Sequence, residues 1–220
     1  MSIPSHKSSA KKTRSVQAPQ RANGKLRVAA ILEAAAAVIT ENGYEGATMA
    51  EIAARSGTKI GSLYRFFPNK ESLADTIVVS ARENVDAVFD KLDAAVKTLS
   101  SRALADEFMN LLLDLLNRPA LVKLLDASQD WSVKPEEFKS AVQQRIVRTL
   151  AIYSPTLPMT SAEEIALVIL LNTKTVAMYH KLPASEPAVL EEFREMARLY
   201  LHSRLGPGDS GRKGKPSQQQ

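Results

Sequence analysis

Hydrophobic residues recur at every third or fourth position along most of the chain, which is the period of an amphipathic α-helix. The first such run begins near Lys25 and places apolar residues at positions 28, 31, 32, 35, 38 and 39. Asn42 and Gly43 then supply residue types that accept the left-handed conformation at a helix end. Because no segment shows the alternating pattern of a β-strand, we predict an all-α fold.

Proline residues and capping residues divide the rest of the chain into further helices. Ser161 and Glu164 have the spacing of a capping box, so a helix is expected to open there. The expected helices after the first three cover residues 69–99, 102–117, a short segment ending at 125, 135–153, 161–180 and a last helix ending near 205.

Residues 48–70 contain two short helical patterns around a glycine turn. Thr48 and Glu51 form a second capping box, in which the hydroxyl accepts from the third backbone N–H and the carboxylate reaches back. Gly57 supplies the turn. In the second helix Leu63, Phe66 and Phe67 can face inward, which leaves basic and hydrogen-bonding groups on the other faces. Two helices arranged in this way are typical of a DNA-reading helix-turn-helix.

These patterns indicate a small N-terminal three-helix helix-turn-helix head followed by a larger helical body. The predicted domains are a disordered basic tail at 1–24, a DNA-binding head at 25–72, an effector-binding and dimerisation body at 73–205, and a disordered tail at 206–220.

The composition, with 45% hydrophobic and 24% charged residues, is that of a globular protein. The chain has no cysteine, which excludes disulfides and thiolate chemistry and suits a reducing cytoplasm. No apolar stretch follows the first lysines, and the longest apolar run, residues 165–171, is far below the roughly 20 residues that cross a bilayer. We therefore expect a cytoplasmic protein with no membrane segment.

The net charge of +5 comes from the ends of the chain. Residues 1–27 carry seven Lys or Arg and no acidic residue, whereas residues 28–205 carry 19 basic and 23 acidic residues. Overall basicity is therefore no evidence that the folded part binds nucleic acid. The basic tail fits two interpretations equally well: an arm attracted to phosphates, and a solubilising extension.

With these residues in view, positions 27–73 resemble the tetracycline-repressor (TetR) family of bacterial transcriptional regulators. The resemblance rests on the sequences ILEAAAAVI, ENGYEGATMAEIAARSG and GSLYRFFPNKESL, which agree with the family in spacing and residue type over 47 consecutive positions. It implies a homodimer that binds a double-stranded DNA operator.

The resemblance also assigns DNA contacts to particular residues. Thr48 and Lys70 stand at helix starts where a phosphate would bind. Ser62 can hydrogen-bond a base edge, Ile60 can pack against a thymine methyl group, and Lys59 can reach guanine or a phosphate. The full set of predicted DNA contacts is Arg27, Thr48, Lys59, Ile60, Gly61, Ser62, Tyr64, Arg65 and Lys70.

Two positions depart from the family pattern. Family members often carry Ser or Thr where Lys59 stands, so Thr58 is expected to cap the second helix of the motif instead. Phe66 replaces a His or Tyr that can donate to a phosphate, and Arg65 is expected to compensate for that donor.

In the body, the family resemblance implies a dimer interface formed by residues 165–178 and 193–201. The first of these segments is apolar nearly all round, which an interior position in a monomer would also explain. A cavity in the body would hold a small, mainly apolar or aromatic effector. The candidate lining residues are Phe89, Phe108, Leu112, Trp131, Asn172 and Thr175.

The sequence therefore favours a homodimeric DNA-binding repressor that a small-molecule effector releases from its operator. A regulator that responds only to a protein partner or to its own abundance is the alternative. An enzyme or metal protein is disfavoured, because His6, His180 and His202 lie in no metal-binding pattern and no nucleophile or phosphate-loop motif is present. We expect no cofactor.

Overall fold

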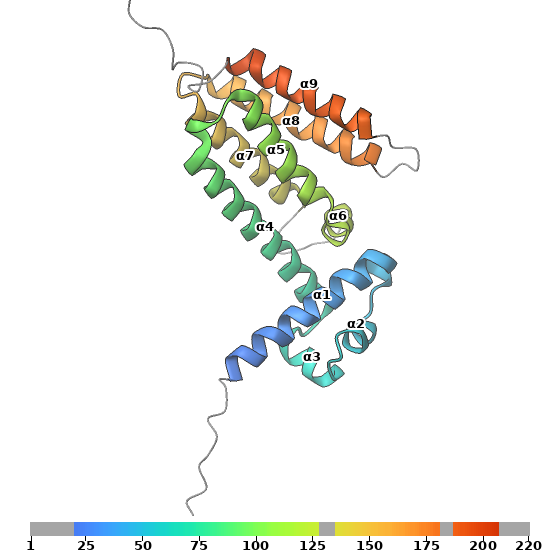
Figure 1. Cartoon of the computed structure of the whole chain (residues 1–220). Coiled ribbons are helices and arrows are strands. Elements are labelled where there is room, and N and C mark those ends of the chain that lie inside the picture. Colours follow the sequence, from blue (N-terminus) through green and yellow to red (C-terminus); the bar gives the residue numbers. More distant parts are fainter. Residues whose placement is uncertain (1–19, 128–134, 181–186, 207–220) are drawn as a thin grey trace, which may run out of the picture.

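The computed structural model of this 220-residue chain describes residues 20–127, 135–180 and 187–206 (Figure 1). In these ranges the regular structure is helical throughout, which confirms the predicted all-α class. The helices are α1 (Gln20–Gly46), α2 (Met49–Arg55), α3 (Ile60–Phe66), α4 (Lys70–Ala95), α5 (Ser101–Leu116), α6 (Pro119–Asp126), α7 (Pro135–Tyr153), α8 (Met159–His180) and α9 (Pro187–Leu205). A short 3-10 helix, Val96–Thr98, extends α4.

The head consists of α1, α2 and α3, and local sequence signals set its turns. Gly43 has φ +73° and interrupts the helical geometry of α1 where Asn42 and Gly43 predict an end. The Glu51 N–H donates to Thr48 Oγ1 over 3.2 Å and caps α2. Gly57, with φ +62°, makes the turn into α3, a conformation that L-residues with a side chain rarely adopt.

Three cations from other helices meet the carboxyl end of α1, which has no basic residue in its own last turn. Arg55 of α2 donates to both carboxylate oxygens of Glu41, at 2.6 and 2.7 Å. Lys70 of α4 donates to the carbonyl oxygens of residues 44 and 45, and Lys123 of α6 donates to the carbonyl of Thr40. These cations complement the partial negative charge of the helix end and tie α2, α4 and α6 to α1.

The body begins with α4, which leaves the head and runs beside α7 (Figure 1). α5 packs along α9 and also contacts α8, while α6 lies between the head and the rest of the body. Phe89 of α4 and Phe108 of α5 are fully buried with their ring centroids 6.4 Å apart, at the centre of a hydrophobic core that all of these helices share. None of the helices in the described ranges combines the length and hydropathy that crossing a bilayer requires.

Several predicted boundaries and caps differ from the structure. α1 begins at Gln20, five residues before the predicted start. α8 begins at Met159 rather than Ser161, because the Ala162 N–H already donates to the carbonyl of Pro158. The Glu51 carboxylate accepts from the Asn42 amide instead of reaching back to Thr48, so only half of that capping box forms. The disorder predicted for 1–19 and 207–220 falls outside the described residues.

Candidate nucleic-acid interface

The helix α3 lies at the end of the head farthest from the body (Figure 1). Leu63 and Phe67 are buried in the hydrophobic core, as the sequence predicts, and α3 packs against α2. The opposite side is open to solvent, since Ile60 is 44% exposed and Tyr64 is 49% exposed. Phe66 is 38% exposed, so the prediction that it faces inward is wrong; a seven-residue helix buries one face, which Leu63 and Phe67 fill.

The polar side chains on this open side have no hydrogen-bond or ion-pair partner among the described residues. Lys59, Ser62, Tyr64 and Arg65 share this property, and so does Arg27 on α1. The neighbouring Arg55, in contrast, is paired with Glu41. The hydrogen bond that Arg55 donates lowers the pKa of the Glu41 carboxyl. The open side of α3 therefore presents donors and a positive charge to whatever approaches it.

The start of α3 carries no side-chain cap. Lys59 occupies the N-cap position, and its carbonyl accepts from the N–H groups of Ser62 and Leu63 at 2.8 and 3.0 Å. Thr58 does not take over the cap, which corrects the expectation from the sequence. The Thr58 N–H instead donates to the carbonyl of Ala53, which holds Thr58 in the turn before α3.

Lys70 has intramolecular partners that the sequence did not reveal. Its Nζ lies 2.8 Å from the carbonyl oxygen of Tyr44 and 4.3 Å from the centroid of the Tyr44 ring. Sequence reasoning expects a phosphate to offset a cation in the first turn of a helix, yet these groups at the end of α1 already do so. Asn69 caps α4 as predicted, since its Oδ1 accepts from the Ser72 N–H.

Tyr44 completes this junction between α1 and α4. Its ring is buried, and its hydroxyl donates to Glu71 Oε1 over 3.2 Å. Burial, followed by the negative charge of Glu71, raises the pKa of Tyr44 far above its usual value. The hydroxyl stays protonated, and the head is fixed to the first turn of α4.

Gly61 and Thr48 have simple surroundings. A Cβ atom added at Gly61 would meet nothing within 4 Å, so the packing of this chain does not require glycine there. Thr48 is exposed, and its hydroxyl is already occupied by the cap of α2.

The residues predicted to line an effector cavity do not line either of the two hollows described below. Phe89, Phe108 and Leu112 are core residues, and Thr175 is exposed on α8 with its hydroxyl bonded to the carbonyl of Leu171. The amide of Asn172 reaches Met109 Sδ at 3.7 Å, and Trp131 lies outside the described residues. An effector cavity lined by these residues stays a prediction.

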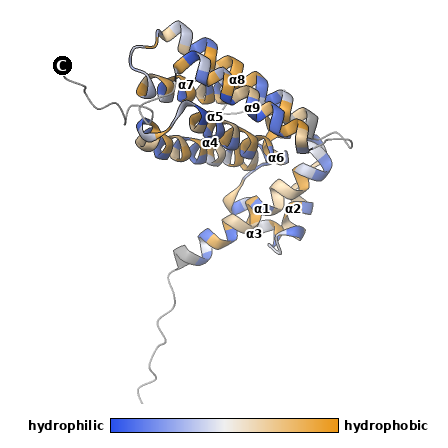
Figure 2. Ribbon diagram, turned by 45° about the horizontal axis from the view of Figure 1, so that its top comes forward, coloured by the Kyte–Doolittle hydropathy of each residue, from blue (hydrophilic) through white to orange (hydrophobic). Residues whose placement is uncertain are grey.

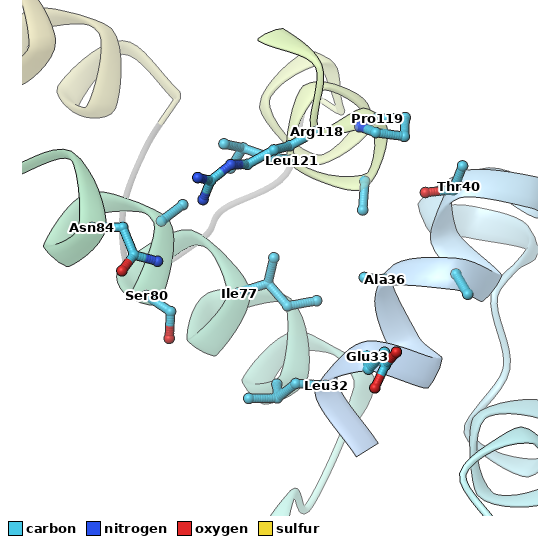
Figure 3. A pocket seen from close by; sticks show the side chains of 13 residues that line it. Leu32, Glu33, Ala36, Thr40, Ile77, Ser80, Asn84, Arg118, Pro119 and Leu121 are labelled. Atoms are coloured by element: carbon cyan, nitrogen blue, oxygen red, sulfur yellow. The ribbon is translucent and has the colours of Figure 1, made fainter. Parts of the chain in front are cut away.

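Other residues of the described part of the chain line two prominent hollows. The larger, of about 430 Å³, is bounded by α1, α4 and α6 (Figure 3), and the other, of about 420 Å³, lies between α4 and α7 near Arg82 and Glu137. Sequence reasoning missed both because their residues come from helices far apart in the chain. The described residues contain no cluster of three or more His, Asp or Glu side chains that could hold a metal.

Known proteins that are similar to this chain include bacterial transcriptional regulators. A family model described as "Bacterial regulatory proteins, tetR family" matches residues 31–77. Over 88 residues the chain is 33% identical to the "HTH-type transcriptional repressor KstR" of Mycolicibacterium smegmatis, a match that spans 40% of each chain.

Solved structures are similar over a larger part of the chain. A TetR-family transcriptional regulator from Streptomyces coelicolor aligns with TM-score 0.57 and 26% identity, covering 81% of this chain and 99% of that one. A transcriptional regulator from Aquifex aeolicus VF5, with TM-score 0.62 and 21% identity over 80% of this chain and 98% of that one, shares the fold.

Proposed function

Because this chain belongs to the TetR family of bacterial regulatory proteins, we propose that it is a homodimeric repressor that binds operator DNA through α3 and that a small-molecule effector releases. The observation that carries the DNA-binding part is the open side of α3, where polar and basic side chains have no partner among the described residues. Family membership sets the chain among transcriptional regulators rather than enzymes.

The dimensions of α3 suit the major groove of DNA. Seven residues in α-helical geometry span about 10 Å, and the groove is about 12 Å wide. Lys59, Ile60 and Ser62 stand in the first turn, the part of a recognition helix that reaches base edges. Gly61, on the same turn, has a hydrogen atom in place of a side chain, which permits the backbone of α3 to approach the groove closely.

Phosphates on either side of the groove would bind the surrounding donors. Tyr64 and Arg65 follow the first turn of α3, and Arg27 is exposed on α1. Thr48 is the N-cap of α2, and the first backbone N–H groups of a helix have no acceptor within the helix. Such contacts fix the orientation of the head and carry no base specificity. Lys70 contributes by holding the first turn of α4 against α1, which positions the head.

The dimer is proposed to form through α8 and α9, where hydrophobic residues recur along the helices (Figure 2). The buried side of α8 includes Ile165 and Ile169. The following large hydrophobic side chains remain at least 42% exposed on α8 and α9: Leu167, Val168, Leu171, Met178, Met196 and Leu199. A two-fold dimer that covers them would carry two heads, which must stand about 34–36 Å apart, or a multiple of that, to enter successive major grooves.

Repression is the proposed output because the similar curated protein from Mycolicibacterium smegmatis is described as a transcriptional repressor. An operator-binding protein acts where the chromosome lies, so we place it in the bacterial cytoplasm. An effector that binds only the DNA-incompetent state would weaken operator binding, and the operator would weaken effector binding by the same factor.

Selection from randomised duplex DNA by the full-length chain tests the DNA-binding part. We expect an enriched site with two related half-sites. Lys59→Ala/Arg65→Ala should weaken binding to this site and reduce the salt dependence by about 0.9 per lost phosphate contact. Lys97→Ala/Arg148→Ala removes the same charge from exposed positions of the body and should leave binding unchanged.

The result that contradicts the proposed surface is selection of the same site, at the same affinity, by the Lys59/Arg65 variant. Equal weakening by both double variants would mean that Lys59 and Arg65 act only through general electrostatic attraction and not through specific contacts of α3. An effector-free regulator remains the alternative, which would keep its operator affinity in the presence of every ligand that stabilises the protein.

A further inference from the structure

The larger hollow lies at the junction of head and body, and its interior is aliphatic (Figure 3). Leu32 and Ala36 approach from α1, Ile77 and Ala81 from α4, and Leu121 from α6. Its volume of about 430 Å³ lies within the range of about 300–1,000 Å³ that small-molecule sites occupy. The alanines leave this space open, because larger side chains at their positions would fill it.

One side of this junction cleft is polar. Arg118, just before α6, extends toward Asn84 on α4, and Ser80 lies one turn before Asn84 (Figure 3). The side chains of Asn84 and Ser80 make no hydrogen bond to the described residues. Arg118 donates through one nitrogen to Asp114 over 2.7 Å, a pair four residues apart in which the Asp114 side chain is 69% exposed.

The charges suit an anion at this side of the cleft. An exposed pair of this kind contributes little to stability, so the guanidinium can exchange or share its partner at small cost. Its planar fork binds carboxylates in a bidentate manner, and Asn84 can donate alongside it. Glu33, on α1, lies on another side of the cleft and repels an anion there, which would orient a ligand with one acidic end (Figure 3).

We propose that the junction cleft binds a small amphipathic carboxylate, with its acidic group at Arg118 and Asn84 and its hydrocarbon part between α1, α4 and α6. The binding claim stands on the cleft itself. Its regulatory consequence rests on the proposed function, because it assumes that the head binds an operator.

A ligand in this cleft would contact both parts of the protein. α1 belongs to the head, whereas α4 and α6 continue into the body, and Lys123 of α6 already joins them by donating to the carbonyl of Thr40 at 2.7 Å. An occupant between α1 and α6 favours the head orientation that accommodates it. Operator affinity then changes if the DNA-bound orientation closes or widens the cleft.

Calorimetric titration of the full-length chain with octanoate, decanoate and dodecanoate, and with decanol as the uncharged match, tests the site. At least one carboxylate should bind, and decanol should bind more weakly. Arg118→Gln should weaken carboxylate binding roughly 10- to 100-fold, as expected for a charge-assisted hydrogen bond. Ala36→Phe should abolish binding by filling the cleft.

Two matched variants make the result specific. Arg148→Gln removes an exposed arginine of α7, and Ala94→Phe enlarges an exposed alanine of α4, so both should bind as the unaltered chain does. Circular dichroism of each variant separates loss of binding from loss of folding, and Arg118→Gln alters a partly exposed side chain that the core does not need.

The absence of binding by all three carboxylates overturns the proposal, and so does binding that Arg118→Gln and Ala36→Phe leave unchanged. Operator affinity is measured separately, with and without the bound carboxylate. Cleft binding that leaves operator affinity unchanged contradicts the regulatory consequence alone, whereas failure to bind any operator contradicts the proposed function and not the site.

Discussion

Lys59 and Lys70 carry the same side chain at the two ends of the α3 region, yet their surroundings differ. Lys59 is exposed and has no partner among the described residues, while Lys70 is half-buried and bonded to two backbone carbonyls of α1. A residue type that suits a phosphate therefore has two different surroundings within twelve residues: Lys59 has a free ammonium group among the described residues, and Lys70 holds the head to α4.

Lys70→Met should destabilise the protein by about 1–3 kcal/mol, because two carbonyls at the end of α1 lose a charged donor. Lys59→Met should change the free energy of unfolding by less than about 0.5 kcal/mol, as exposed substitutions usually do. Urea unfolding followed by circular dichroism measures both. Equal stability of the two variants would contradict the assignment of Lys70 as a structural lysine.

Gly61→Ala separates the requirements of folding from those of DNA binding. The added methyl group meets open space and removes backbone entropy from the unfolded chain, so stability should rise by about 0.5 kcal/mol. Operator affinity should fall, because the methyl group would lie between α3 and the groove. Thermal unfolding and fluorescence anisotropy measure the two effects.

Gly57→Ala is the matched control for that substitution. It also adds one methyl group, but at φ +62°, where an L-side chain costs about 1–2 kcal/mol. It should lower stability, in contrast to Gly61→Ala. If Gly61→Ala leaves operator affinity unchanged, α3 does not approach DNA through its first turn.

Local interactions at this scale could be predicted from the sequence, whereas distant ones could not. The caps at Thr48 and Asn69 join residues three positions apart, so spacing alone reveals them. The carbonyls that bind Lys70 lie 25 and 26 residues earlier, and only the packing of α1 against α4 brings them together. Surface exposure of Phe66 likewise depends on which face of α3 the other helices cover.

At the scale of helices, Arg145 of α7 joins α4 by lying within a group of acidic residues on that helix. The Nη2 of Arg145 lies 2.5 Å from Asp90 Oδ1 and 3.4 Å from Asp93 Oδ2, and Thr149 donates to the other oxygen of Asp93. The guanidinium also lies over the ring of Phe89, 5.4 Å from its centroid. The charged groups of this joint are thus connected directly to the aromatic core of the body.

Arg145→Met should lower the free energy of unfolding by about 2–4 kcal/mol, since it keeps most of the apolar stem but leaves Asp93, whose side chain is 9% exposed, short of a cation. Arg148, 3.4 Å from the same carboxylate, limits the loss. Adding Asp93→Asn should recover part of it, which a double-mutant cycle in urea would measure. A loss that Asp93→Asn does not reduce would mean that the arginine acts through Phe89 instead.

Helix boundaries show how far hydrophobic patterns reach. The periods predicted the existence and order of the helices, because each buries one face in the core. Capping signals were less reliable: Ser161 has the residues of a capping box, yet the chain enters α8 directly after Pro158. Proline fixes the backbone before a helix more strongly than a cap favours a later start.

At the scale of the whole molecule, cavities could not be predicted from hydrophobic side chains. The predicted lining residues Phe89, Phe108 and Leu112 are large and fill the core. The junction cleft exists where small residues such as Ala36 and Ala81 face each other from different helices. A sequence identifies residues able to fill space more readily than places where space remains, since the latter depend on the relative positions of three helices.

The proposed dimer is the last property at this scale, and a charge placed on its surface tests it. Leu171 of α8 is 56% exposed and stands among the hydrophobic residues assigned to the interface. Leu171→Glu would place one buried carboxylate from each protomer in a two-fold interface. We therefore expect the free energy of dimer association to weaken by about 2–4 kcal/mol for each copy, which promotes dissociation. Val88→Glu, at a similarly exposed apolar position on α4, should leave the association unchanged.

Sedimentation velocity of the full-length chain should therefore give a dimer for the unaltered protein and for Val88→Glu, and a monomer for Leu171→Glu at the same concentration. Operator affinity should fall with the dimer, because one head alone contacts one half-site, while circular dichroism should show that the helices persist. A Leu171→Glu protein that remains dimeric would move the interface away from this face of α8. A monomeric variant that binds the full operator as tightly as the unaltered chain would show that the two heads do not depend on α8 and α9 for their spacing.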